Sequence, residues 1–346
     1  MITRRALMAS TAASLFPYVS TTANASKTVT WRFGHALPLN SPAVENFQYM
    51  FEQIAERTDG RFKIEIAAMA AQGFDRSDSL RLVAHQKVYD VVHHFPSYVV
   101  RDEPLFDAAV VPLHGLVDAD DNAKVIDVQQ EIAREIAAKW RLEFISFEHV
   151  SGEQKRVYIL SKKPFQSLED LKSVKLRHWS RLGVDVFRSV GVPAQVIPAS
   201  ELYLALQNGT VDATVVPVNY AASLADVTDY ASYATPFIAS TPSGFLARQK
   251  TWNALPNEFK EVWQDVTSAQ MQKDLASYDE DTIEPQLLEE LKTKGITILD
   301  PLPEEDRRTL QAQALRSWRE SAKKLGRKSI GYYERIVAEL GVASDQ

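Results

Sequence analysis

Apolar residues follow two alternating spacings along most of the chain, and these spacings predict a succession of strands and helices. Residues 28–33 and 62–66 alternate apolar and polar positions as strands do, whereas residues 42–57 repeat apolar positions along one helical face. A helical pattern over 78–86 and a strand over 88–92 follow. This order predicts a parallel α/β sheet with helices covering both faces.

The same succession recurs further along the chain. Leu176 lies in a predicted strand, followed by a helix over 184–190, a strand over 195–198, a helix over 200–208 and a strand over 211–215. Two copies of one α/β unit predict two similar lobes, and ligands of such sheets bind beyond the carboxyl ends of the strands. We therefore expect a ligand cleft between the lobes.

Single residues also repeat, which favours a duplication of the unit. Three matches share a spacing of 122 positions: Leu80 with Leu202, Leu82 with Leu204, and Asp90 with Asp212. Beyond the repeat, residues 270–291 and 303–340 are charged and helical in pattern, which predicts long helices packed across the lobes. No low-complexity linker separates the two units, so we expect crossing strands to join the lobes.

The first 25 residues differ from the rest and resemble an export signal. Arg4 and Arg5 precede the uncharged stretch 6–16, and Ala23 and Ala25 form the small-x-small pattern that signal peptidase cuts. The run around the two arginines is similar to a twin-arginine signal. A disordered N-terminus is the alternative, and a membrane anchor is less favoured because a spanning helix needs about 20 apolar residues.

Composition and charge restrict the partners. The chain has 346 residues, 45% of them hydrophobic, which suffices for one large core or two smaller ones. Removal of residues 1–25 takes away two arginines and no acidic residue, so the formal charge moves from −6 to −8. This charge argues against binding nucleic acid or an anionic membrane. The absence of cysteine excludes disulfides, thiolate metal sites, a cysteine nucleophile and a lipid-anchored cysteine. We expect a free, monomeric protein of the periplasm.

Motifs typical of enzymes are absent from the sequence. It has no GxSxG elbow, no P-loop and no GxGxxG after a strand. His93 and His94 are adjacent on a predicted strand, so their side chains point to opposite faces and do not converge on one metal ion. We expect neither catalysis, nor a cofactor, nor a metal site; an exported α/β enzyme remains the alternative that turnover would reveal.

Five segments, in order, resemble the solute-binding proteins of tripartite ATP-independent periplasmic (TRAP) transporters. The family segments "GH", "KTGGRVKI", "DLKGLKIR", "SELYTALQ" and "WxxLP" correspond to residues 34–35, 57–64 (RTDGRFKI), 170–177 (DLKSVKLR), 200–207 (SELYLALQ) and 252–256. The resemblance covers essentially the whole chain after residue 25. It implies two lobes joined by a hinge, which close over a small organic acid and deliver it to integral-membrane permease subunits. We expect lobe I to hold residues 26–153 and about 240–281, and lobe II residues 154–239 and about 282–346.

Two arginines are candidates for binding a carboxylate. Arg177 ends the predicted strand 174–176, and its planar guanidinium can grip a carboxylate through two parallel hydrogen bonds. The resemblance places Arg177 at the carboxylate clamp of the family. Arg156 matches a second arginine of the family in spacing, although the residues around it differ. A solvated lysine–arginine cluster is the alternative for Arg156.

The remaining candidates suggest an apolar ligand body. Where the family carries an asparagine that hydrogen-bonds the ligand, this chain has Val216, and the matching position of the first repeat is His94. Phe74 and Trp179 stand beside other expected cleft positions, as does His35. Each aromatic residue taken alone suits the core better than a pocket. Together with Val216 they favour a monocarboxylate with an apolar or aromatic body. The alternatives are a C4-dicarboxylate or keto acid, or a binding protein that serves a receptor or another transporter class.

Overall fold

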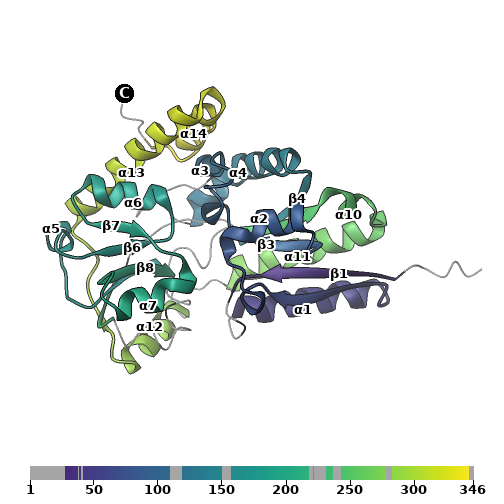
Figure 1. Cartoon of the computed structure of the whole chain (residues 1–346), viewed down its shortest axis with the longest axis horizontal. Coiled ribbons are helices and arrows are strands. Elements are labelled where there is room, and N and C mark those ends of the chain that lie inside the picture. Colours follow the sequence, from purple (N-terminus) through teal and green to yellow (C-terminus); the bar gives the residue numbers. More distant parts are fainter. Residues whose placement is uncertain are drawn as a thin grey trace, which may run out of the picture.

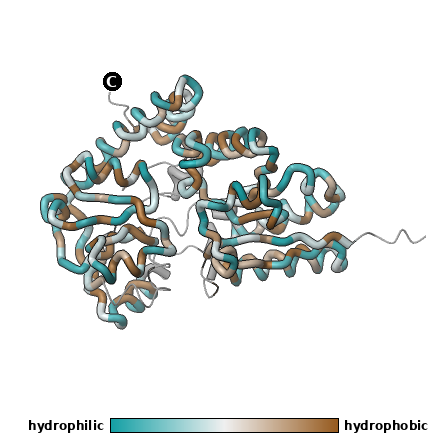
Figure 2. The backbone as a smooth tube through the Cα atoms, viewed as in Figure 1, coloured by the Kyte–Doolittle hydropathy of each residue, from teal (hydrophilic) through white to brown (hydrophobic). Residues whose placement is uncertain are grey.

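The computed structural model shows two lobes side by side, each built on one twisted sheet (Figure 1). The structure describes residues 28–37, 39, 42–109, 119–149, 157–217, 221, 231–236, 243–277 and 283–342. The expected export signal, residues 1–25, lies outside the described residues. Hydrophobic stretches gather on the central strands of each lobe (Figure 2). Within the described part, no helix is both long and apolar enough to cross a bilayer. The expected two-lobed α/β fold is confirmed.

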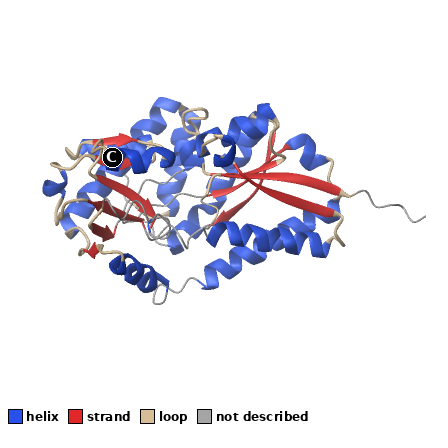
Figure 3. Ribbon diagram, turned by 60° about the horizontal axis from the view of Figure 1, so that its bottom comes forward, coloured by secondary structure: helices blue, strands red, loops and turns tan. Residues whose placement is uncertain are grey.

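Lobe I has a five-stranded sheet in the order β2-β1-β3-β10-β4. Its strands are β1 (Val29–His35), β2 (Phe62–Ala68), β3 (Val91–His94), β4 (Leu142–His149) and β10 (Ser243–Arg248). The first three are parallel, and β10 is antiparallel to both neighbours. Helices α1 (Pro42–Arg57) and α11 (Asn257–Ser277) pack together along one face, and α4 (Ala119–Lys139) packs on β4. Figure 3 shows these strands between layers of helices.

Lobe II has a six-stranded sheet in the order β11-β9-β5-β8-β6-β7. Its strands are β5 (Val157–Ser161), β6 (Leu176–His178), β7 (Ala194–Val196), β8 (Ala213–Pro217), β9 (Tyr233–Pro236) and β11 (Thr297–Ile298). Among the described residues, this lobe contains the helices α5 (Leu168–Leu171), α6 (Arg181–Ser189), α7 (Leu202–Gln207) and α12 (Ile283–Thr293).

The two sheets share one plan, as the sequence repeat predicts. The parallel strands β2, β1 and β3 of lobe I correspond to β7, β6 and β8, and an antiparallel strand, β10 or β5, follows in each lobe. Asp90 accepts the Arg32 N–H at 2.9 Å, and Asp212 accepts the Lys175 N–H at 3.2 Å, at the start of equivalent strand pairs. Leu80 and Leu202 are both buried. The third match differs, because Leu82 is buried whereas Leu204 is 55% exposed.

Two C-terminal helices connect the lobes. Helix α13 (Glu304–Leu325) packs on α6 of lobe II, and α14 (Arg327–Glu339) packs on α4 of lobe I. The helices are separate because Gly326 adopts a left-handed φ of 103° between them. The helical pattern expected over 270–291 corresponds to the end of α11 and the first part of α12, and residues 278–282 between them lie outside the described residues.

Candidate functional site

Arg177 is buried in the middle of β6, where parallel pairing places it beside Gln195 of β7 and Thr214 of β8. Its Nε donates to the Ile197 carbonyl at 2.8 Å and its Nη1 to the Val215 carbonyl at 3.1 Å. These neutral acceptors orient the guanidinium without removing its positive charge. The arrangement therefore suits a bound anion, for which a planar guanidinium is the strongest partner. Arg177 lies within β6, not at the end of a strand over 174–176 as the sequence suggests.

The side chains beside Arg177 are buried and apolar. Val216 of β8 lies two residues after Thr214 and therefore on the same face of the sheet as Arg177. Antiparallel pairing places Tyr158 of β5 opposite Val216, and both side chains belong to one buried cluster. Sequence reasoning missed Tyr158.

Arg156, the second predicted contact, lies outside the described residues. The described part of β5 begins at Val157. Its role as a ligand contact stays a prediction.

The residues that follow Arg177 form a tight turn into α6. The His178 ring accepts the Ser180 N–H at Nδ1, 3.0 Å away, and stands 4.3 Å from the Trp179 ring. The Ser180 hydroxyl caps the helix by accepting the Gly183 N–H. A Cβ at Gly183 would lie 2.2 Å from His178 Cε1, so this packing requires glycine. Trp179 is buried, with 8% of its surface exposed.

His35 occupies the lobe I position equivalent to His178. It ends β1, is fully buried, and accepts the Leu37 N–H at Nδ1, 3.3 Å away, just as His178 accepts from Ser180. An Nδ1 that accepts leaves the ring proton on Nε2 in the neutral form. The sequence singled out His35 but not His178, since only the strand pairing reveals that the two positions correspond.

The lobe I position equivalent to Arg177 itself is Gly34. Gly34 pairs with Val92 of β3, as Arg177 pairs with Thr214 of β8. A Cβ at Gly34 would lie 2.8 Å from the Tyr89 ring. The ring of Tyr89 thus occupies the space that a side chain at this position needs.

His94 and His93 point to opposite faces of β3, as expected. His94 Nδ1 lies 3.2 Å from the Ser79 hydroxyl and its ring 5.0 Å from Phe106, whereas His93 packs on Phe47. Burial lowers the pKa of His94 to about 3, and the neighbouring His93 adds to this effect. His94 is therefore neutral at physiological pH. No three His, Asp or Glu side chains of the described part are grouped closely enough to hold a metal ion.

One hydrogen bond connects the two lobes near the predicted residues. The Ser200 hydroxyl donates to Asp75 Oδ2 at 3.2 Å. Asp75 follows the half-buried Phe74 of lobe I, and Ser200 follows closely on Ile197, whose carbonyl holds Arg177. The segment of Phe74 and the segment that orients Arg177 therefore face each other. His35, His94 and Phe74 come from lobe I, and Arg177, Trp179 and Val216 from lobe II.

Comparisons with known proteins agree with this fold. The chain is 27% identical over 252 residues to the monocarboxylate 2-oxoacid-binding periplasmic protein of Nostoc sp. (strain PCC 7120), covering 69% of this chain and 65% of that protein. The match thus spans slightly less than two thirds of that relative. The chain is also 23% identical to a solute-binding protein of Verminephrobacter eiseniae, covering 80% of this chain and 81% of that one.

Solved structures share the fold. DctP7 of Bordetella pertussis, an extracytoplasmic solute receptor binding pyroglutamic acid, superposes with a TM-score of 0.76 at 19% identity, covering 91% of this chain and 100% of that one. A TRAP solute-binding protein of Desulfovibrio salexigens with bound orotic acid gives a TM-score of 0.75 at 20% identity, covering 90% and 99%.

Residues 33–325 match the family described as bacterial extracellular solute-binding protein, family 7, or DctP. This match covers most of the chain and confirms the resemblance seen in its motifs. By family and by fold the chain is therefore a solute-binding protein, not an enzyme, and it belongs to the bacterial extracellular solute-binding proteins of family 7.

Proposed function

We propose that this chain is the periplasmic subunit of a TRAP transporter and captures a monocarboxylate with an apolar or aromatic body. The observation that carries the proposal is the buried, carbonyl-oriented guanidinium of Arg177 with apolar Val216 on the same face. The carboxylate would bind Arg177, assisted by Arg156, and the apolar body would lie toward Val216 and lobe I.

The relatives support a monocarboxylate ligand. The Nostoc protein is described as binding monocarboxylate 2-oxoacids, and the Bordetella receptor binds pyroglutamic acid, a monocarboxylate with a small ring. A bound acid that contacts both lobes would stabilise the closed form, since a ligand shifts an equilibrium only through its different affinity for the two states. The closed protein would then dock on the integral-membrane permease subunits.

The proposed organisation follows from this role. Residues 1–25 would direct export and be removed, leaving a monomer in the periplasm. Lobe I would comprise residues 26–153 and about 240–281, and lobe II residues 154–239 and about 282–346.

Calorimetric titration of the mature chain with phenylacetate, 4-methyl-2-oxopentanoate, pyroglutamate and succinate tests the ligand class. We expect at least one monocarboxylate to bind tenfold or more tightly than succinate. A ligand at 100 times its dissociation constant stabilises the protein by about 2.7 kcal/mol, so thermal melting provides an independent readout. Tightest binding of succinate would instead establish the C4-dicarboxylate alternative.

The transport role needs its own test. Proteoliposomes that hold the permease subunits encoded beside this chain should take up the bound acid only when the mature chain is added. Uptake that is independent of the chain would favour the receptor alternative.

A further inference from the structure

A cavity lies in lobe I, at the end of the sheet opposite to the candidate residues of this lobe. It has a volume of about 860 Å³ and is lined by residues from the start of β1, the turn before β3, the turn before β4, the end of β10, and α10 (Gln249–Asn253). Val29 at the amino end of β1 lines it, whereas His35 ends the same strand. Six strand residues span roughly 20 Å, so the two sites are well separated.

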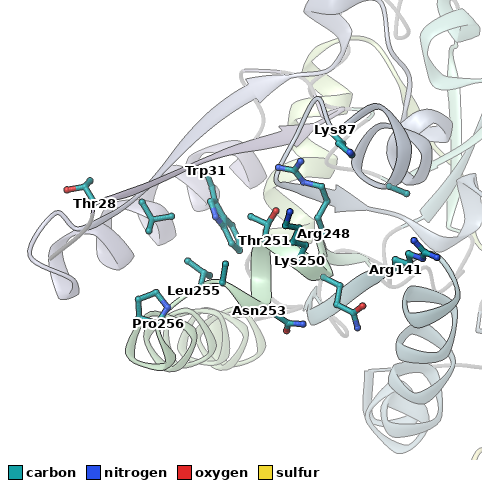
Figure 4. A pocket seen from close by; sticks show the side chains of 14 residues that line it. Thr28, Trp31, Lys87, Arg141, Arg248, Lys250, Thr251, Asn253, Leu255 and Pro256 are labelled. Carbon is teal, nitrogen blue, oxygen red and sulfur yellow. The ribbon is translucent and has the colours of Figure 1, made fainter.

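The walls of this cavity differ in chemistry. Four cations from three segments gather on one side: Lys87, Arg141, and the near neighbours Arg248 and Lys250. Trp31, Leu255 and Pro256 lie on the other side (Figure 4). No aspartate or glutamate lines the cavity. One wall is therefore cationic and the opposite wall apolar.

Three of the four cations have no anionic partner nearby. Arg248 pairs with Asp90, which fixes its position at the end of β10. The side chains of Lys87, Arg141 and Lys250 make no ion pair or hydrogen bond with any residue that the structure describes. In contrast, Arg57 and Arg61 of the same lobe each pair with a carboxylate. The chain as a whole has a formal charge of −6, so this positively charged wall has the opposite sign to the net charge of the protein.

We propose that this cavity is a second binding site, for an organic anion that carries a phosphate or carboxylate group on an apolar body. The anionic group would lie between Arg141 and Lys250, where it relieves the repulsion among the cations. The apolar body would pack on Trp31 and Leu255, which supply contact area that a bare inorganic ion cannot use. The source of such an anion is either a free metabolite or the headgroup and glycerol region of an anionic lipid.

A fluorine NMR titration with 4-fluorophenyl phosphate tests the proposal. The experiment uses the mature chain carrying Arg177→Ala, so that the cleft does not contribute to the signal. We expect saturable binding at one site, and an affinity at least tenfold lower in both Lys250→Glu and Arg141→Glu. Both side chains are exposed, so the substitutions leave the core intact. Lys63→Glu on β2 is the matched control, since it changes the charge equally outside the cavity.

Two further measurements identify the class of ligand. Inorganic phosphate should bind at least tenfold more weakly than the aryl phosphate, and equal affinity would overturn the assignment of an apolar body. Cosedimentation with phosphatidylglycerol vesicles that is lost in Lys250→Glu would identify a lipid as the source, whereas binding of the soluble probe alone would identify a free metabolite. Equal probe affinity in the Lys250, Arg141 and Lys63 variants, or no saturation at all, would overturn the proposal.

Discussion

The backbone of lobe II orients the guanidinium of Arg177. Two backbone carbonyls, those of Ile197 and Val215, hold its Nε and Nη1 at 2.8 and 3.1 Å. A group that is already in its bound orientation loses little conformational entropy when the ligand binds. This arrangement also requires a guanidinium. Its planar fork of N–H donors can bond the backbone carbonyls and a ligand at the same time, whereas the ammonium group of a lysine is a compact point charge.

Replacement of Arg177 should therefore abolish measurable binding. We expect Arg177→Ala to weaken affinity by about 2–5 kcal/mol, since the ligand carboxylate is left without its charged partner. Arg177→Lys should fail as well. Calorimetry with the best ligand from the acid panel measures the effect, and thermal melting checks that each variant folds. Arg181→Ala is the matched control, because Arg181 is exposed on α6 and pairs with Asp185. Unchanged affinity in Arg177→Ala would exclude the clamp.

Val216 tests the nature of the ligand body. The side chain is 1% exposed and faces Tyr158, so an asparagine at this position introduces an amide among apolar groups. We expect Val216→Asn to lower affinity for the preferred monocarboxylate by about 1–3 kcal/mol. Val196→Asn, at a 47% exposed site on β7, should have no effect. If wild type and Val216→Asn show the same preference for succinate-like acids, the apolar pocket is wrong and only the clamp survives.

At the scale of elements, local sequence patterns predict where helices and strands occur, but they do not predict the register in which strands pair. The alternation over 28–33 and the helical spacing over 42–57 correspond to β1 and α1. The strand expected over 88–92 is instead β3 at Val91–His94, because pairing with β1 and β10 decides where the ladder begins. The same shift affects β6, and it explains why Arg177 was expected at a strand end.

The turn from β6 into α6 gives a prediction at this scale. Gly183→Ala would place a Cβ 2.2 Å from the His178 ring and force the ring away from Ser180. We expect a loss of about 1–3 kcal/mol in unfolding free energy and weaker ligand binding, because the displaced ring follows directly on Arg177. Urea denaturation and calorimetry measure the two effects.

Gly331→Ala is the matched control for this change. Gly331 lies inside α14 with nothing within 4 Å of its added Cβ. Alanine there should leave binding unchanged and stabilise the helix by about 0.5–1 kcal/mol. A Gly183→Ala variant as stable as wild type would contradict the packing described for His178.

At the scale of the whole molecule, helix α13, which packs on lobe II, also contacts Asp107 of lobe I. Trp318 donates its indole N–H to the Asp107 carbonyl at 2.9 Å, and the Ser321 hydroxyl donates to the Asp107 carboxylate at 3.2 Å. Burial raises the pKa of Asp107 to about 6; the Ser321 hydrogen bond opposes this shift, and the charge of Asp185 adds to it. The junction between the lobes therefore contains a carboxyl group that titrates near neutral pH.

Stability should fall with rising pH because of Asp107. An unfolded aspartate has a pKa of about 3.9, so the folded state holds this proton more tightly. The stabilisation is complete below about pH 4 and is lost as the pH passes about 6. We expect Asp107→Asn to raise the unfolding free energy at pH 7.5 by about 1–2 kcal/mol and to leave it nearly unchanged at pH 4.

Urea denaturation at both pH values measures this difference. Asp265→Asn is the control, because Asp265 is 64% exposed and pairs with Arg57. Equal pH dependence in wild type and Asp107→Asn would show that Asp107 is not the titrating group.

The site was only partly predictable from the sequence, for a reason that belongs to the whole molecule. Motifs singled out Arg177, His35 and Val216 as candidates because each lies inside a segment typical of the family, and their roles stay predictions. Tyr158, His178 and the contact between Asp75 and Ser200 depend on strand pairing or on the approach of two lobes, and no local spacing encodes either. Asp107 was missed likewise, since its burial comes from helices more than two hundred residues later.

Gly34 of lobe I occupies the position equivalent to Arg177 of lobe II, so the two lobes differ at this pair of positions. The repeated unit supplies a charged position in lobe II and, at its counterpart in lobe I, a glycine closed off by the Tyr89 ring. A ligand bound as proposed would therefore meet Arg177 at its carboxylate end and no equivalent arginine at Gly34. A second carboxylate at its other end would find no charged partner at that position, although the two sheets share one plan. We therefore expect the two lobes to distinguish the two ends of a bound molecule at this one pair of equivalent positions.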